Sequence, residues 1–178
     1  MANAATIHIS RFAEADPEKF RRVIDVNVVG SFLTAQAALP QLATSGGYLL
    51  FVSSISGLVQ GPFQPAYNAS KAAVDALANT LRHEATPLGV DVGTIFFHAV
   101  DTPTAGAALH HELMRPLSAG RAMKPAPVEG AAAAIVSAVR QRTRVSSYPK
   151  KGPLWIYRTA LIQRLVDRMV ARRVPGRS

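Results

Sequence analysis

The chain has 178 residues, contains no cysteine and carries a formal net charge of +9. This length corresponds to one domain with a sizeable core, and the lack of cysteine excludes a disulfide framework and thiol chemistry. No run approaches the ~18 apolar residues of a membrane-spanning helix. The first residues also lack the basic and apolar regions of a signal peptide. A cytoplasmic location is therefore expected.

The charge is unevenly distributed along the chain. Residues 140–178 hold eleven of the twenty Lys/Arg residues and one of the eleven Asp/Glu residues. The body 1–153 is expected to form one domain, and 154–178 a basic amphipathic tail. Peripheral contact of 154–173 with an anionic membrane, packing over a substrate cleft and a merely solubilising tail all remain open. Nucleic-acid binding is not expected, because no stripe of aromatic residues accompanies the basic ones.

The first predicted element is a long helix over residues 17–44. Asp16 and Pro17 form a typical helix start, with an acidic N-cap followed by proline at the first helical position. Apolar residues then recur at helical spacing until a glycine pair begins at Gly46. Asn27 lies inside this apolar pattern, where an unpaired amide is costly. From this segment alone, a satisfied core amide and a functional side chain are both open.

The rest of the chain alternates strands and helices. We predict a strand at 48–53, a loop at 55–65, a helix at 67–85, a strand at 90–97, a mobile lid at 104–124, a helix at 127–142 and a short strand at 144–148. Ser53 and Ser54 end the first strand, and the loop 98–103 follows the second. Ligands bind at this end of open α/β sheets.

Tyr67 and Lys71 are four residues apart and therefore share one face of the predicted helix. A free tyrosine has a pKa near ~10, and an adjacent cation stabilises the phenolate and lowers that pKa. Ser54, thirteen residues before Tyr67, can meet it across the loop and donate a hydrogen bond to the same substrate oxygen. The YxxxK pattern is common by chance, but a serine at this spacing on a hydrophobic strand makes it specific.

The histidines do not predict a metal site. His110 and His111 are adjacent, so they point apart on a helix, and no third ligand has suitable spacing. Solvated lid residues are the favoured interpretation. His98 follows the second strand near the expected site, where contact with a substrate and packing of the loop are both open.

The order of elements and motifs resembles the short-chain dehydrogenase/reductase family over about residues 2–145. Asn27, in the segment FRRVIDVNVVG, matches one member of the catalytic tetrad of that family. The other three members match Ser54, Tyr67 and Lys71.

Two further motifs match cofactor-binding positions of the family. Thr102, in VDTP, matches the residue that holds the nicotinamide carboxamide. Ala2-Asn3-Ala4-Ala5 resembles the end of the family's NNAG segment, with Ala5 in place of glycine. The resemblance implies NAD or NADP as cofactor, with the choice between them open. The cofactor-binding residues that it implies are Asn3, Tyr67, Lys71, Val100 and Thr102.

The resemblance also implies an architecture and a mechanism. The fold would be α/β, a Rossmann-like three-layer parallel sheet with about three strands here and flanking helices. Tyr67 would be the general acid/base, Lys71 would lower its pKa and hold the nicotinamide ribose, and Ser54 would fix the substrate oxygen. Asn27 would hold a water that links Lys71 to solvent.

The chain departs from the family pattern at two places. The glycine-rich TGxxxGxG turn, expected roughly 75–80 residues before Asn3, does not occur in it, nor does the first βαβαβ half. The chain is therefore expected to be N-terminally truncated relative to the family, and the strand at 48–53 to present a bare edge. The second departure is Phe97-His98, where many members have Pro-Gly. The larger residues would narrow the nicotinamide-side wall, or belong to a subgroup with a different loop.

Two functions follow from these observations. The first is an NAD(P)-dependent oxidoreductase that interconverts a hydrophobic alcohol and ketone. The alternative is a catalytically inactive truncated member that acts only in oligomerisation or membrane association. In both cases the resemblance implies a homo-oligomer formed through helices 17–44 and 67–85.

Overall fold

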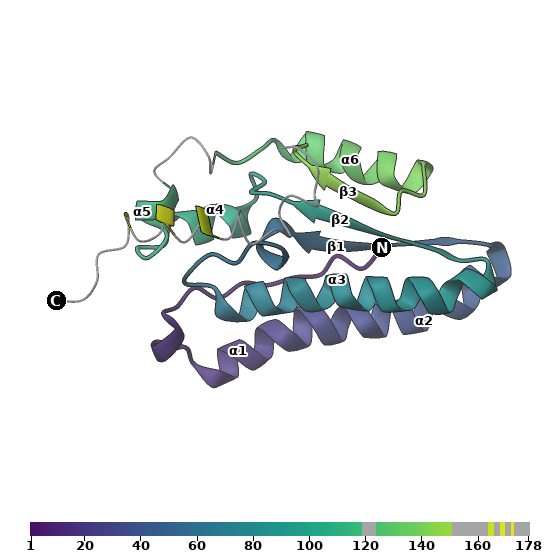
Figure 1. The fold of residues 1–178 in the computed structure, drawn as a ribbon, viewed down its shortest axis with the longest axis horizontal. Coiled ribbons are helices and arrows are strands. Elements are labelled where there is room, and N and C mark those ends of the chain that lie inside the picture. Colours follow the sequence, from purple (N-terminus) through teal and green to yellow (C-terminus); the bar gives the residue numbers. More distant parts are fainter. Residues whose placement is uncertain (119–123, 151–163, 166–167, 170–171, 173–178) are drawn as a thin grey trace.

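The computed structural model describes residues 1–118, 124–150, 164–165, 168–169 and 172. Its described sheet has three parallel strands in the order β1-β2-β3: β1 (Tyr48–Ser54), β2 (Asp91–Phe97) and β3 (Val145–Tyr148). Helices α1, α2 and α3 lie on one face of the sheet and α6 on the other (Figure 1). This three-layer arrangement confirms the predicted Rossmann-like α/β fold.

The helices follow the predicted order with small changes at their ends. Their bounds are α1 (Pro17–Ile24), α2 (Gly30–Ser45), α3 (Pro65–Ala85), α4 (Pro103–His110), α5 (Arg115–Ser118) and α6 (Val128–Arg140). Shorter helical turns are η1 (Phe12–Glu14), η2 (Asp25–Val29), η3 (Ile55–Gly57) and η4 (Thr86–Leu88). Helix α3 begins before the predicted residue 67, because Pro65 is well suited to the first helical turn.

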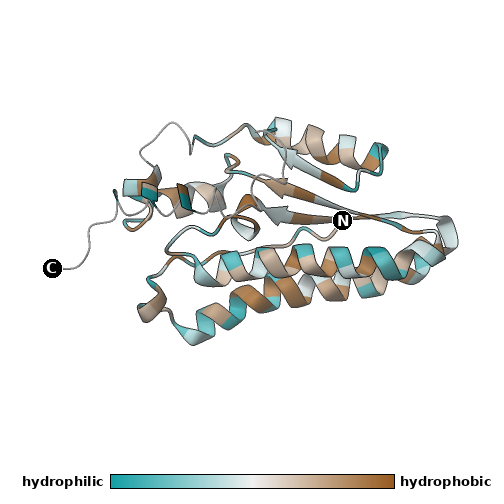
Figure 2. Cartoon of the chain, viewed as in Figure 1, coloured by the Kyte–Doolittle hydropathy of each residue, from teal (hydrophilic) through white to brown (hydrophobic). Residues whose placement is uncertain are grey.

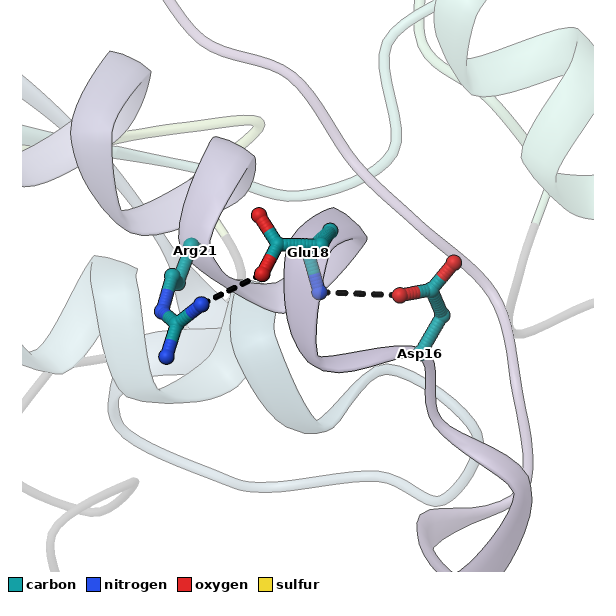
Figure 3. Close-up of polar contacts among 3 residues, drawn as sticks. All are labelled: Asp16, Glu18 and Arg21. Atoms are coloured by element: carbon teal, nitrogen blue, oxygen red, sulfur yellow. Dashed lines mark hydrogen bonds and ion pairs between the residues drawn. The ribbon is translucent and has the colours of Figure 1, made fainter.

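The predicted helix 17–44 is present as the continuous stretch α1–η2–α2. Its start is capped as expected: Asp16 accepts a hydrogen bond from the Glu18 amide at 2.8 Å, and Arg21 pairs with Glu18 (Figure 3). The sequence did not predict the π-helical turn η2, which places Asn27 at the widened part of the helix. Such turns often occur at functional sites.

The middle of this helical stretch exposes three large apolar side chains, Val29, Phe32 and Leu33. By length and composition alone, Pro17–Ser45 could cross a membrane, although core helices of soluble proteins pass the same test. The stretch meets this test by mean hydropathy and not by an unbroken apolar run, which it does not contain. Only 22% of its most apolar window is buried, and the middle of the stretch is hydrophobic (Figure 2). Its outer side is thus available to contact another surface.

The core has one part on each side of the sheet. Phe51, Val74 and Val92 are among the buried residues between the strands and the helix pair α2–α3. Leu50, Ile95 and Ala138 belong to the part under α6. Strands β1 and β2 are buried on both faces, as expected for parallel strands covered by helices.

The outer edge of β1 is partly covered. Ala2 forms a parallel bridge with Phe51, donating its amide to Leu50 O at 2.9 Å and accepting from the Val52 amide at 3.0 Å. The predicted bare edge is therefore blunted at this one position by the N-terminal segment.

Two sequence-based expectations lie wholly or partly outside the described residues. The predicted lid 104–124 corresponds to α4 and α5, and residues 119–123 of it lie outside the description. The expected tail 154–178 is described only at five positions, each in a helical conformation. The proposed boundary near residue 153 stays a prediction.

Candidate active site

The site forms where β1 and β2 end beside the start of α3. Ser54 is the last residue of β1, and its hydroxyl donates to Phe97 O and accepts from the Ser56 amide, both at 3.2 Å. The same hydroxyl hydrogen-bonds the side chain of Tyr67. The sequence prediction that Ser54 and Tyr67 meet across the loop is therefore realised in the structure.

Helix α3 and the end of β1 are joined by two buried hydrogen bonds. Lys71 is only 3% exposed, and its Nζ donates to Val52 O at 3.0 Å. Ser53 donates to Lys71 O at 2.8 Å. These bonds fix the first turns of α3 against the strand end that carries Ser54.

Gly57 permits the close approach of η3 to α3. A Cβ at this position would lie 2.7 Å from Lys71 C and 2.8 Å from Ala72 N, both backbone atoms. A side chain here would require the loop or the helix to move. Gly57 therefore keeps Ser54 and Tyr67 within reach of each other.

The charge state of the Tyr67–Lys71 pair differs from the sequence-based expectation. Lys71 Nζ lies 5.7 Å from the centre of the Tyr67 ring. Burial lowers the pKa of Lys71 to about 8. Burial raises the pKa of Tyr67, and the hydrogen bond between Ser54 and Tyr67 opposes this rise. The expected lowering of the Tyr67 pKa by Lys71 is therefore wrong for this structure.

Asn27 joins three segments of the chain. Its side chain is fully buried; Oδ1 accepts from the Thr6 amide at 2.7 Å, and Nδ2 donates to Thr6 O and to Ser70 Oγ, both at 2.9 Å. Both polar atoms of the Asn27 side chain therefore have hydrogen-bond partners, as is usual for buried polar groups. This pairing accounts for an asparagine inside an apolar helix.

A pocket of about 300 Å³ adjoins these residues. It is lined by Ser54, Tyr67, Gln64 and Ser56, by the segment Ala5 to Ile7, by the turn residues Ala99 and Thr102, and by lid residues that include Leu109 and Met114. No charged side chain lines it among the residues that the structure describes. A larger cavity, about 880 Å³, lies between η1 and the start of α3 and does not include Tyr67.

The cofactor positions expected from the sequence are only partly gathered at this pocket. Thr102 lines it, and its hydroxyl caps α4 by accepting from the Ala105 amide at 3.2 Å. Val100 forms a bridge with Ala126 and Asn3 is exposed; neither is among the lining residues.

His110 and His111 do not line the pocket. His110 contacts Gly106 O, and His111 accepts from the Leu113 amide. Over the described parts of the chain, no group of three His, Cys, Asp or Glu residues could hold a metal ion.

A comparison with known protein families identifies the family of this chain. The family described as short chain dehydrogenase matches residues 1–113, which include Asn27, Ser54, Tyr67, Lys71 and Thr102. The chain belongs to the short-chain dehydrogenase family.

Curated relatives of this short-chain dehydrogenase chain are oxidoreductases. It is 41% identical over 101 residues to a peroxisomal 2,4-dienoyl-CoA reductase of Saccharomyces cerevisiae, covering 57% of this chain and 35% of that protein. It is 34% identical over 105 residues to a trans-4-hydroxycyclohexanecarboxylate dehydrogenase of Sinomonas cyclohexanicum, covering 58% and 40%. The chain thus spans well under half the length of these relatives.

Solved structures show the same fold. A short chain dehydrogenase from Burkholderia cenocepacia, in complex with NADP, superposes with a TM-score of 0.73 at 24% identity, over 97% of this chain and 69% of that one. A 4-hydroxyisoleucine dehydrogenase complexed with NADH gives a TM-score of 0.70 at 21% identity, over 83% and 63%.

Several residues that shape this short-chain dehydrogenase site were not selected from the sequence. Ser70 and Thr6 pair with Asn27 over 43 and 21 residues of sequence, a separation that no local pattern reveals. Gly57 could have been noticed as a glycine in the loop after Ser54. Met114, in the predicted lid, lines the pocket and is buried.

Proposed function

We propose that this chain carries the proton-transfer apparatus of an NAD(P)-dependent oxidoreductase that interconverts an alcohol and a ketone. The observation that supports it most is the hydrogen bond between Ser54 and Tyr67 at a pocket beside buried Lys71. The relatives named as a dehydrogenase and a reductase support the same reaction class.

Tyr67 acts as the general acid/base. Because burial raises its pKa, the phenol is protonated near neutral pH and can donate its proton to a carbonyl oxygen during reduction. In the reverse direction, the phenolate accepts the proton of the alcohol. Ser54 has one hydroxyl proton, which would turn from Phe97 O to donate to the same substrate oxygen and fix its position.

Tyr67 and Thr102 line the pocket and Lys71 is buried beside Tyr67, and these groups fit the nicotinamide end of an NAD(P) cofactor. An ammonium has three N–H donors, and Val52 O accepts one from Lys71 within the described part of the chain. Thr102 accepts from Ala105, which leaves its own O–H to donate. Lys71, Tyr67 and Thr102 would hold the cofactor, with Asn3 and Val100 proposed as further contacts. When bound, the cofactor supplies or accepts the hydride.

Asn27 is proposed to stabilise the site rather than to donate to the substrate. Its side chain is engaged by Thr6 and Ser70, so a water between Lys71 and solvent would have to use its backbone carbonyl. That carbonyl already accepts from Ser31 Oγ at 2.6 Å and has a second lone pair.

The proposed substrate is a small, uncharged, hydrophobic alcohol or ketone. Ile7, Leu109 and Met114 give the pocket apolar walls, and no described lining residue could neutralise a carboxylate or phosphate. A volume of about 300 Å³ is at the low end of the range for ligand pockets.

We also propose that two copies pack through α2 and α3, in the cytoplasm. Val29, Phe32 and Leu33 are 42%, 46% and 52% exposed on the long helical stretch. A groove of about 290 Å³ lies between the two helices, and exposed Ala69 and Ala76 allow a partner to approach α3 closely. Large exposed apolar side chains that cluster are typical of interfaces.

The cofactor part of the proposal is tested by titrating the purified chain with NADH and NADPH and following nicotinamide fluorescence. Saturable binding is expected, weakened about tenfold or more in Lys71→Met, which removes a charge-assisted hydrogen bond. Lys19→Met, at an exposed position of α1, is the matched control. Absence of binding up to millimolar cofactor would instead favour the alternative of a chain that acts only by association.

A further inference from the structure

Ser70 lies at the centre of a buried chain of hydrogen bonds. It is fully buried on α3. Its hydroxyl accepts from Asn27 Nδ2 at 2.9 Å and donates to Tyr67 O at 2.8 Å. A serine hydroxyl has a single proton to donate, so these two bonds define its orientation.

This chain of bonds connects two of the segments that line the pocket. Thr6 and Tyr67 both line it, yet they lie on different segments. Thr6 is bound on both backbone groups by Asn27, and Asn27 is bound to Ser70, three residues after Tyr67. The path Thr6–Asn27–Ser70–Tyr67 therefore sets the separation of the two walls.

A purely local role for Ser70 does not account for these contacts. A serine within a helix can satisfy itself by bonding a carbonyl one turn earlier, as Ser70 does with Tyr67 O. However, Asn27 is fully buried, and one of its two amide protons is directed at Ser70. Without the hydroxyl, that proton has lost its acceptor in a dry interior, and the Asn27 amide is free to turn away from Thr6.

We propose that Ser70 is a positioning residue that, through Asn27, holds the pocket wall at Thr6 in register with the turn of α3 that carries Tyr67. The importance of that register for turnover rests on the proposed function. The mechanical coupling between Ser70 and Thr6 does not depend on it and can be measured in the chain without cofactor.

The test is amide hydrogen exchange by NMR in the full chain, comparing Thr6 with the amides of β2. In Ser70→Ala, the Thr6 amide is expected to exchange about tenfold faster relative to the β2 amides, as for loss of one hydrogen bond. Ser70→Thr keeps the hydroxyl and should restore the ratio. Equal acceleration at Thr6 and β2, or an unchanged Thr6, would overturn the proposal.

Ser53→Ala is the matched control. It deletes another buried serine hydroxyl that donates to a carbonyl of α3, Lys71 O at 2.8 Å, but it leaves Asn27 untouched. It should lower global stability without changing the ratio between Thr6 and β2, and a changed ratio here would contradict the specific path. If Ser70→Ala does not fold, Ser70→Cys replaces the hydroxyl by a thiol, which is only a weak acceptor. It should raise the ratio between Thr6 and β2 in the same direction, and an unchanged ratio would overturn the proposal.

Turnover separates this proposal from the proposed function. If the chain reduces ketones, Ser70→Ala should lower kcat as well as raise KM, because a substrate bound against a released Thr6 wall is less well aligned with Tyr67. An unchanged kcat in Ser70→Ala would show that the position of Thr6 relative to Tyr67 is not required for catalysis. A failure of Tyr67→Phe to affect turnover would overturn the proposed function and leave the exchange result standing.

Discussion

At the residue scale, the Tyr67–Lys71 pair shows why spacing alone does not give charge states. Four-residue spacing correctly predicts that the two side chains lie on one face. The loss of solvation in the folded chain is not visible in the sequence. Lys71 Nζ is bound to a backbone carbonyl at 3.0 Å, and burial is the leading cause of both pKa shifts, up for Tyr67 and down for Lys71.

The lowered pKa of Lys71 predicts a pH-dependent stability. The folded value is about 8 and the ordinary value 10.5, so below pH 8 folding bears the full cost of a buried ammonium. That cost disappears as the pH rises from 8 to 10.5, because the folded state then holds the neutral amine. Lys71→Met should therefore gain stability relative to wild type at pH 7, and lose roughly 3 kcal/mol of that gain by pH 10.5.

Urea unfolding of both proteins across this range measures the difference. Lys19→Met, which removes an exposed lysine, is the control. A difference between Lys71→Met and wild type that does not shrink with rising pH would contradict the burial of a charged amine at this position.

The candidate site was predictable to the extent that its residues stand in local motifs. Tyr67 and Lys71 fall within one turn of a helix, and Ser54 ends the strand before it. By contrast, Ser70 acquires its role from a bond to a residue 43 positions away. The π-helical turn around Asn27 was equally hidden, since it depends on how the amide meets Thr6 and α3.

At the element scale, the contact between η3 and α3 depends on Gly57. Gly57→Ala places a methyl group within 3 Å of the backbone of Lys71 and Ala72 and should destabilise the fold by about 1–3 kcal/mol. It should also separate Ser54 from Tyr67. Thermal unfolding measures the first effect. Gly61→Ala is the control, because its nearest neighbour would be a flexible side-chain atom at 3.6 Å; an equal loss in both variants would refute the close contact.

The short helices α4 and α5 close the pocket through residues packed on Ile9. Met114 and Leu117 are 5% and 4% exposed in the same cluster, but only Met114 also lines the pocket. Met114→Ala and Leu117→Ala should each lower the free energy of unfolding by about 2–5 kcal/mol, which lower melting temperatures would show. Only Met114→Ala should improve binding of bulkier ketones, measured by ligand-observed NMR. If Leu117→Ala broadens ligand preference equally, Met114 is not the wall of the pocket.

At the scale of the whole molecule, the apolar outer face of α2 predicts self-association. Leu33→Glu introduces a charge at a position that is 52% exposed, so it should leave the monomer fold intact while weakening a helix-to-helix interface. Sedimentation velocity should show a shift toward monomer. Leu88→Glu, 47% exposed in η4, is the control. An unchanged sedimentation coefficient in Leu33→Glu would place any interface elsewhere.

The fold itself followed closely from hydrophobic pattern and turn residues. The continuous apolar run at 48–52 became part of a parallel strand buried on both faces, and the Asp16-Pro17 start became a capped helix. What the pattern could not give was the N-terminal contact of Ala2 with β1, because a single residue has no periodicity. The high mean hydropathy of Pro17–Ser45 was also not predicted, since the count of consecutive apolar residues does not measure mean hydropathy.

The most direct test of the central claim is reduction of small uncharged ketones by the purified chain at pH 7, followed as oxidation of NADH or NADPH. Tyr67→Phe removes only the hydroxyl that donates the proton, so kcat should fall by about 10²–10⁴-fold, with an unchanged circular dichroism spectrum. Tyr148→Phe, whose hydroxyl donates to Pro127 O outside the pocket, should retain activity. Wild-type turnover in Tyr67→Phe would contradict the assignment of Tyr67 as the general acid.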